Sequence, residues 1–169
     1  MRDLVEQLAY NRRLDNASLK ALLNGCVTDV HLLQLLRDYA VRTAREQFGL
    51  GVYIRGLIEV SSYCRCDCMY CGLRRSNRTA ERYRLTLDDI LRCAEEGYKL
   101  GFRTFVMQGG EDGTHTDEWL VSVISKLREL YPDVAITLSL GERSEESYRK
   151  LKEAGANRYL LRHETANSE

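Results

Sequence analysis

The sequence lacks three features that would place it in other classes of protein. Neither sign of charge is in excess, because 25 Lys and Arg residues balance 25 Asp and Glu residues. No summed field therefore attracts a polyanion, and we expect no nucleic-acid or membrane-surface partner. No apolar run approaches the roughly 20 residues that span a bilayer, and the first residues are amphipathic without the apolar core of a secretory signal. We expect a cytoplasmic protein.

What is present is typical of a globular protein. The chain has 169 residues, of which 44% are hydrophobic and 30% charged. This length is enough for one ordinary domain with a hydrophobic core.

Hydrophobic periodicity divides the chain into a helical first part, residues 1–50, and a remainder, residues 51–169, in which strands and helices alternate. Within the first part, residues 3–47 are predicted to be helical, with Thr28 as the N-cap of a long amphipathic helix. Residues 52–60 have the β-branched composition of a buried strand. Further strands are predicted at 104–108, 134–140 and 158–161, and helices at 86–100, 117–130 and 144–154. Gly101 and Gly155 are expected near helix C-caps.

Four strands joined by helices predict an α/β fold with a parallel sheet, either open or part of a (β/α)8 barrel. Both architectures bind ligands at the carboxyl ends of the strands. The chemically reactive residues follow the strands here, in segments 64–71, 108–112, 139–142 and 162–164. A complete TIM-type barrel takes about 250 residues. We therefore expect the N-terminal half of such a barrel, about four βα units preceded by N-terminal helices, within a longer protein.

Four of the six cysteines fall within eight residues, at Cys64, Cys66, Cys68 and Cys71. Without a secretory signal, this cluster predicts metal binding rather than disulfides, whereas Cys26 and Cys93 are expected to be core or surface thiols. The spacing C-x3-C-x2-C lets three thiolates bind three irons of a cubane and leaves the fourth iron open. Zinc is the alternative, but structural zinc usually takes two separated ligand pairs, and no second pair follows.

With its aromatic residue before the last cysteine, the motif is similar to the signature of the radical S-adenosylmethionine (SAM) superfamily. The segments that further resemble the HydE family of iron-iron hydrogenase maturases are CGLRRSN, RYRLT, QGGED, TLSLGE and RYLLRHETAN. This resemblance runs from about Val52 onward and covers about the first half of that family's length. It implies a 4Fe-4S cluster that reductively cleaves SAM to a 5′-deoxyadenosyl radical, in anaerobic maturation of the hydrogenase active site.

The resemblance also implies roles for individual residues. The cluster ligands would be Cys64, Cys68 and Cys71. The SAM-binding positions would be Tyr70, Gly109, Gly110, Thr137, Ser139 and Glu164. Arg162 matches a guanidinium suited to capture the carboxylate of a small-molecule substrate. The implied partners are a reduced ferredoxin or flavodoxin-type electron donor and other hydrogenase maturases.

Several alternatives stay open. Cys66 would close the site if it bound the fourth iron, although its charged neighbours favour a peripheral thiol. Gly109-Gly110 could be only a tight turn, and Arg162 with Glu164 an ordinary surface ion pair. Methylornithine synthase and biotin synthase share the barrel and the cysteine spacing, and a half-length chain could be an inactive iron-sulfur binding fragment.

The remaining candidates are given no catalytic role. This applies to His31, His115 and His163, which are expected to be structural or solvated, or to face away from the site. A run of arginines could dock an electron donor, but a solvated loop is favoured for Arg74, Arg75, Arg78 and Arg82.

Overall fold

The computed structural model describes residues 1–162 and divides the chain into two compact units, Met1–Tyr53 and the residues from Ile54 onward. Two residues considered in the sequence, His163 and Glu164, lie outside the described residues.

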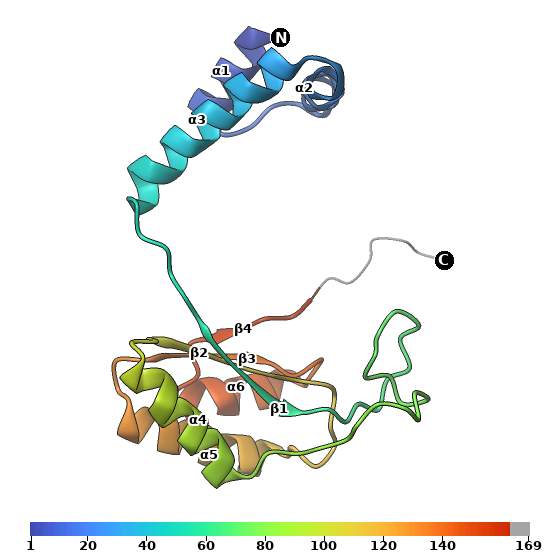
Figure 1. Cartoon of the computed structure of the whole chain (residues 1–169), viewed down its shortest axis with the longest axis vertical. Helices are drawn as coiled ribbons and strands as arrows, with labels where there is room; N and C mark the ends of the chain where they lie inside the picture. Colours follow the sequence, from blue (N-terminus) through green and yellow to red (C-terminus); the bar gives the residue numbers. More distant parts are fainter. Residues whose placement is uncertain (163–169) are drawn as a thin grey trace. The chain divides into compact units, whose positions relative to one another are not determined.

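The first unit consists of three helices, α1 (Arg2–Asn11), α2 (Asn16–Thr28) and α3 (Val30–Phe48), as Figure 1 shows. They pack around the buried side chains of Val5, Leu22 and Leu32. Apolar residues recurring at helical spacing on each helix supply this small core.

The predicted N-cap at Thr28 is wrong, because Thr28 is the last residue of α2 and Asp29 caps α3. The Asp29 carboxylate accepts hydrogen bonds from the backbone N–H groups of His31, at 2.9 Å, and Leu32, at 3.1 Å. A carboxylate at this position satisfies two free donors and also suits the positive end of the helix dipole. The break between the two helices therefore falls one residue later than predicted.

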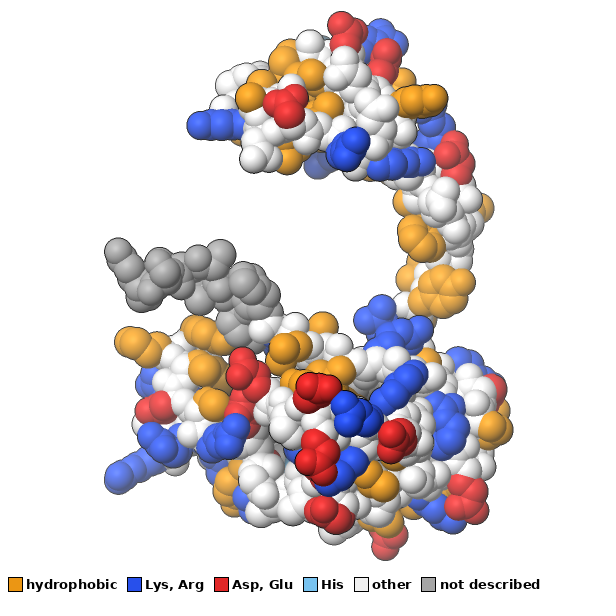
Figure 2. Space-filling view, turned by 180° about the vertical axis from the view of Figure 1, so that it is seen from behind, with side chains coloured by type: hydrophobic (Ala, Val, Ile, Leu, Met, Phe, Trp, Pro, Cys, Tyr) orange, Lys and Arg blue, Asp and Glu red, His pale blue; other side chains and the backbone are white. Residues whose placement is uncertain are grey.

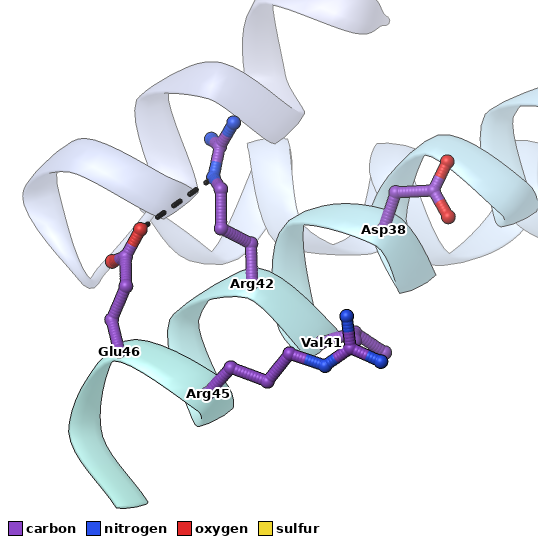
Figure 3. Close-up of a pocket in the computed structure, with 5 residues that line it drawn as sticks. All are labelled: Asp38, Val41, Arg42, Arg45 and Glu46. Carbon is purple, nitrogen blue, oxygen red and sulfur yellow. Dashed lines mark ion pairs between the residues drawn. The ribbon is translucent and has the colours of Figure 1, made fainter. Parts of the chain in front are cut away.

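One face of α3 bears an open hollow, drawn in Figure 3, which is lined by Asp38, Val41, Arg42, Arg45 and Glu46. All five come from one helix, so no second element converges on the hollow. The ion pair between Arg42 and Glu46 spans 3.9 Å, with both side chains more than half exposed. Such surface pairs contribute about 1 kcal/mol or less. We assign this hollow no function.

The second unit alternates strands and helices in the order β1 (Gly56–Ser61), α4 (Leu87–Lys99), β2 (Thr104–Gly109), α5 (Asp117–Leu130), β3 (Ala135–Ser139), α6 (Glu145–Glu153) and β4 (Arg158–Tyr159). The strands form one parallel sheet in the order β1-β2-β3-β4. The three helices cover the same face of this sheet (Figure 1). The predicted α/β class with a parallel sheet is confirmed.

The helices of this unit begin and end where the sequence predicts. Thr86, Thr116 and Ser144 are their N-caps, and each side chain accepts a hydrogen bond from a backbone N–H of the first turn. Gly101 and Gly155, just past the ends of α4 and α6, have φ of 94° and 116°. Glycine adopts this left-handed conformation without steric cost, as a helix C-terminus requires.

The core lies between the sheet and the helices. Its strand residues are Ile58, Val60, Phe105, Met107, Ile136 and Leu138, and its fully buried helix residues include Ile90, Leu120, Ile124 and Leu151. The prediction of a buried strand over residues 52–60 is wrong in two respects. The strand begins at Gly56, and Leu57 is 55% exposed. Since the three helices cover one face of the sheet, alternate residues of β1 point away from them.

The surface of this unit mixes both signs of charge, as Figure 2 shows. Acidic and basic residues are equal in number over the whole chain. No helix within residues 1–162 is both long enough and apolar enough to cross a membrane.

Candidate functional site

The four clustered cysteines lie in a closed loop that leaves the carboxyl end of β1 (Figure 1). The register between β1 and β2 is irregular between Glu59 and Ser61, and such a bulge commonly redirects a strand near a functional site. The chain returns beside the strand it left, because Leu85 N–H donates to Val60 O at 2.9 Å and Ser62 N–H to Tyr83 O at 3.1 Å. We call residues 62–82 the cysteine loop.

Within the cysteine loop the thiols are free. Cys64, Cys66 and Cys71 are half-buried, whereas Cys68 is exposed. A turn joins two of the predicted ligands, since Cys71 N–H donates to Cys68 O at 3.0 Å. In the described part of the chain, no three His, Cys, Asp or Glu side chains are close enough to hold one metal ion. A cubane binds each thiolate through a different iron, so its ligands do not have to meet at one ion.

The loop after β2 packs against the start of the cysteine loop through Glu111. Its backbone N–H donates to Cys64 Sγ at 3.4 Å, and Arg65 N–H donates to Glu111 O at 3.0 Å. Hydrogen bonds to the ligating sulfurs are one of the means by which a protein tunes the redox potential of a cluster. Three thiols in one loop, one of them already accepting an N–H, fit the chemistry of a cluster with an open iron.

Gly109 and Gly110 allow this close packing. A Cβ on Gly110 would stand 2.4 Å from Tyr63 O and 2.5 Å from Cys64 Cβ, and one on Gly109 would stand 3.2 Å from Ser61 O. No side chain fits at Gly110 without moving the backbone. The glycine pair therefore has a packing role next to Cys64, and its contact with SAM stays a prediction.

The Glu111 carboxylate lies beside the additional thiol, Cys66. It pairs with Arg65 at 2.8 Å and accepts a hydrogen bond from Glu142 N–H at 3.2 Å. Burial, together with the negative charge of Glu111 and the neighbouring Cys64, raises the pKa of the Cys66 thiol to about 11. The peripheral role of Cys66 stays a prediction.

Two residues that sequence reasoning missed, Arg84 and Asp112, join the two loops. Asp112 is almost fully buried and accepts hydrogen bonds from Arg84, Ser61 and Thr114. Burial opposes ionisation, but these donors outweigh it and hold the pKa of Asp112 well below its usual range. Arg84 also lies over the Tyr63 ring, with 3.7 Å between its Cζ and the ring centre. No local pattern in the sequence marks this pair, because Arg84 and Asp112 lie 28 residues apart and meet only when the two loops fold together.

The arginines of the cysteine loop do not form a single solvated run. Arg75 and Arg78 are exposed, but Arg82 is half-buried and hydrogen-bonded to the backbone of the loop. The expectation of a solvated side chain is wrong for Arg82, because its guanidinium satisfies carbonyl groups that the loop leaves without strand or helix partners.

Other predicted site residues share the sheet face opposite the helices. Thr137 and Ser139 on β3 alternate with core residues and are each 6% exposed. Ser139 is paired in register with Gln108, whose Oε1 accepts a hydrogen bond from Arg162 Nη2 at 2.6 Å. The structure thus brings Thr137, Ser139 and Arg162 to one face. Tyr70 lies in an exposed turn of the cysteine loop, at 69% exposure.

A separate hollow of about 540 Å³ opens between the loop after β2 and the N-termini of α5 and α6. Charged and polar side chains line it, among them Arg65, Glu111, His115 and Arg143. His115 is buried and stacks on Trp119 with 4.3 Å between ring centres. None of the described predicted site residues lines this hollow.

The fold and the cysteine loop define an α/β protein with a candidate iron-sulfur site at the carboxyl ends of its strands. Residues 58–169 match the sequence profile of the Radical SAM superfamily, and the chain belongs to this superfamily. Its members use a 4Fe-4S cluster and SAM.

Proteins similar in sequence to this chain include a hydrogenase maturase and a biotin synthase. The FeFe hydrogenase maturase subunit HydE of Thermotoga maritima is 40% identical over 98% of this chain and 46% of its own length. A biotin synthase of Magnetococcus marinus is 32% identical over 77% of this chain and 41% of its own length.

Among solved structures, HydG, a maturase of the FeFe hydrogenase, matches with a TM-score of 0.85 and 27% identity, over 98% of this chain and 37% of that chain. The likeness confirms the predicted partial barrel. The chain spans less than half the length of each of these three proteins.

Proposed function

We propose that this chain is part of a radical SAM enzyme that reductively cleaves SAM at a 4Fe-4S cluster during maturation of an FeFe hydrogenase. The observation that carries the proposal is the contact between Cys64 and Glu111, which fixes the first predicted ligand beside the glycine pair. The 40% identity to HydE supports the maturation role.

In this proposal Cys64, Cys68 and Cys71 bind three irons and leave the fourth without a protein ligand. An open coordination position distinguishes catalytic metal sites from structural ones. A bound cluster would supply the one electron needed to cleave SAM into methionine and a 5′-deoxyadenosyl radical. The role of the protein would be to bind and orient the cluster and SAM.

The remaining site residues would hold SAM and substrate. Thr137 and Ser139 present nearly buried hydroxyl groups, each able to donate and accept a hydrogen bond. Tyr70 would lie against the adenosine, and Glu164 would contact SAM from beyond β4. Arg162 would bind the carboxylate of a small-molecule substrate, exchanging its hydrogen bond to Gln108 for a bidentate pair.

The proposed reaction needs a source of electrons and a reducing compartment. A reduced ferredoxin or flavodoxin-type protein is the proposed donor, and other hydrogenase maturases are proposed partners. Thiolate ligands persist where cysteines stay reduced, which favours the cytoplasm as the location.

A second candidate is a biotin synthase-like activity, which the 32% identity to a biotin synthase favours. Both candidates cleave SAM and differ in the substrate that the radical attacks. Release of 5′-deoxyadenosine in the presence of each candidate substrate separates them.

The proposal is tested by single Cys→Ala variants of Cys64, Cys68 and Cys71 after anaerobic reconstitution with iron and sulfide. Cys66→Ala and Cys93→Ala are matched controls, because Cys66 lies inside the motif and Cys93 is an exposed thiol on α4. Iron content should fall in the first three variants and stay at the wild-type level in both controls. With a reductant, only chains that hold the cluster should convert SAM into methionine and 5′-deoxyadenosine. A wild-type chain that binds iron without cleaving SAM would point to a binding module instead.

A further inference from the structure

One guanidinium, that of Arg82, holds the cysteine loop closed from within. Arg82 Nη1 donates to Leu73 O at 2.9 Å and also to Ser62 O. Its Nη2 donates to Arg74 O at 2.8 Å and to Asn77 O at 3.1 Å. Both terminal nitrogens are therefore used, each by two backbone carbonyls.

The positions of these carbonyls give Arg82 its significance. Ser62 precedes Cys64, whereas Leu73, Arg74 and Asn77 all follow Cys71. The guanidinium therefore connects the two flanks of the segment that contains every predicted cluster ligand. The same flanks are also joined by the extended return of the chain at Tyr83 and Leu85 and by Arg84 over the Tyr63 ring. Inside the loop, Arg75 N–H donates to Cys66 O at 2.9 Å and Ser76 N–H to Asp67 Oδ1 at 2.9 Å. Arg82 differs from these contacts because one side chain binds carbonyls on both flanks.

The arrangement needs an arginine in particular. A planar guanidinium presents five N–H donors in a fixed fork, so it can bind four carbonyls that converge from two sides. A lysine ammonium has three donors on a flexible stem and cannot reproduce this pattern. The acceptors are backbone carbonyl groups, so they are present whatever side chains the loop carries.

We propose that Arg82 is the positioning residue of the cluster: it fixes the cysteine loop in the conformation in which Cys64, Cys68 and Cys71 can bind the cluster together. This inference rests on the proposed function, since it assumes that these three thiols are the ligands. Arg82 touches neither the thiols nor, in this proposal, SAM, and it acts through the backbone. Groups that orient metal ligands typically change metal affinity about 10- to 100-fold when removed.

The test compares Arg82→Gln and Arg82→Lys with the wild-type chain and with Arg78→Gln. Arg78 is a matched control because it is an exposed arginine of the same loop. All four proteins are reconstituted anaerobically, and iron release to a competing chelator is timed. The spectrum of the reduced cluster is recorded by electron paramagnetic resonance (EPR). Thermal unfolding of the iron-free proteins reports any general loss of structure.

The expected result is iron release about 10-fold faster in Arg82→Gln and severalfold faster in Arg82→Lys, with a changed cluster signal in both. Arg78→Gln should match the wild type in both readouts. If Arg82→Gln fails to fold, Arg82→Lys, which keeps the charge, decides the question. Wild-type release rates and spectra in folded Arg82 variants would overturn the inference. A wild-type chain that holds no cluster would instead overturn the proposed function.

Discussion

Arg84 holds the carboxylate of Asp112 with two hydrogen bonds, from Nε to Oδ2 at 2.6 Å and from Nη2 to Oδ1 at 3.1 Å. Arg84 stands just past the end of the cysteine loop, and Asp112 stands in the loop after β2. The pair therefore ties together the two loops that form the candidate site. The Asp112 side chain is 2% exposed and that of Arg84 is 39% exposed. The carboxylate is therefore buried from solvent, whereas the guanidinium is partly hydrated.

Replacing Asp112 with Asn should lower the free energy of unfolding by about 1–3 kcal/mol, because the charged donors of Arg84 would lose a buried charged acceptor. Asp133→Asn is the matched control, since Asp133 pairs with Arg103 while both side chains are about half exposed. Its effect should stay below about 1 kcal/mol. Urea unfolding at neutral pH measures both. An equal decrease in the free energy of unfolding in the two variants would show that the buried pair stabilises the fold no more than the exposed one.

The stability that Asp112 provides should depend on pH with a defined sign. Its folded-state pKa lies below the ordinary value of 3.8, so its contribution is complete above that value and is lost as the pH falls through the depressed folded-state pKa. The stability difference between wild type and Asp112→Asn should be constant from about pH 7 to pH 4 and shrink below about pH 4. Unfolding curves at stepped pH test this. A difference that grows on acidification would contradict the assignment.

A methyl group on Gly110 should displace the cysteine loop, because its Cβ would meet the backbone of Tyr63 and the side chain of Cys64. Gly110→Ala should cost about 1–3 kcal/mol, as overpacking typically does, and lower the iron bound after reconstitution. Gly113→Ala is the control, since no other atom lies within 4 Å of the position that its Cβ would take. That variant should stay within about 0.5 kcal/mol of the wild type. Full iron binding by Gly110→Ala would mean that the close contact is dispensable.

Helix α3 should depend on its observed cap rather than on the predicted one. Asp29→Ala removes the acceptor of two backbone N–H groups and should destabilise the first turn by about 1 kcal/mol. Thr28→Ala should change stability by less than about 0.5 kcal/mol. Amide hydrogen exchange at His31 and Leu32 reports the difference directly. Faster exchange in Thr28→Ala than in Asp29→Ala would mean that Thr28, the cap predicted from the sequence, is the N-cap after all.

The order of strands and helices in the second unit could be predicted from the sequence, in part because α4 and α6 have a local signal at both ends. Thr86 and Ser144 begin helices, and Gly101 and Gly155 follow their ends, all through contacts within a few residues. The cap of α3 was missed because Thr28 and Asp29 are both good capping residues. Only the backbone path shows which of them stands outside the helix.

The sequence predicts the candidate ligands, which stay a prediction, but it does not predict the contacts that hold the two loops of the candidate site together. Three cysteines at a set spacing lie within one short segment, so the sequence displays them together. Both supporting residues make contacts with residues far away in the sequence. Arg82 donates to Ser62 O, and Asp112 accepts from Ser61 and Arg84. Such contacts depend on how the loops fold back, and no local pattern records them. The exposure of one face of β1 could not be predicted either, since composition alone does not show which side of a sheet the helices cover.

The central claim is that Cys64, Cys68 and Cys71 hold a cluster with one iron open to SAM. The most direct test is EPR spectroscopy of the reduced, anaerobically reconstituted chain, recorded with and without SAM. We expect a 4Fe-4S signal in the wild type whose shape changes when SAM is added, and no such signal in the three Cys→Ala variants. A wild-type signal that SAM leaves unchanged, or a signal that survives loss of Cys64, would contradict it.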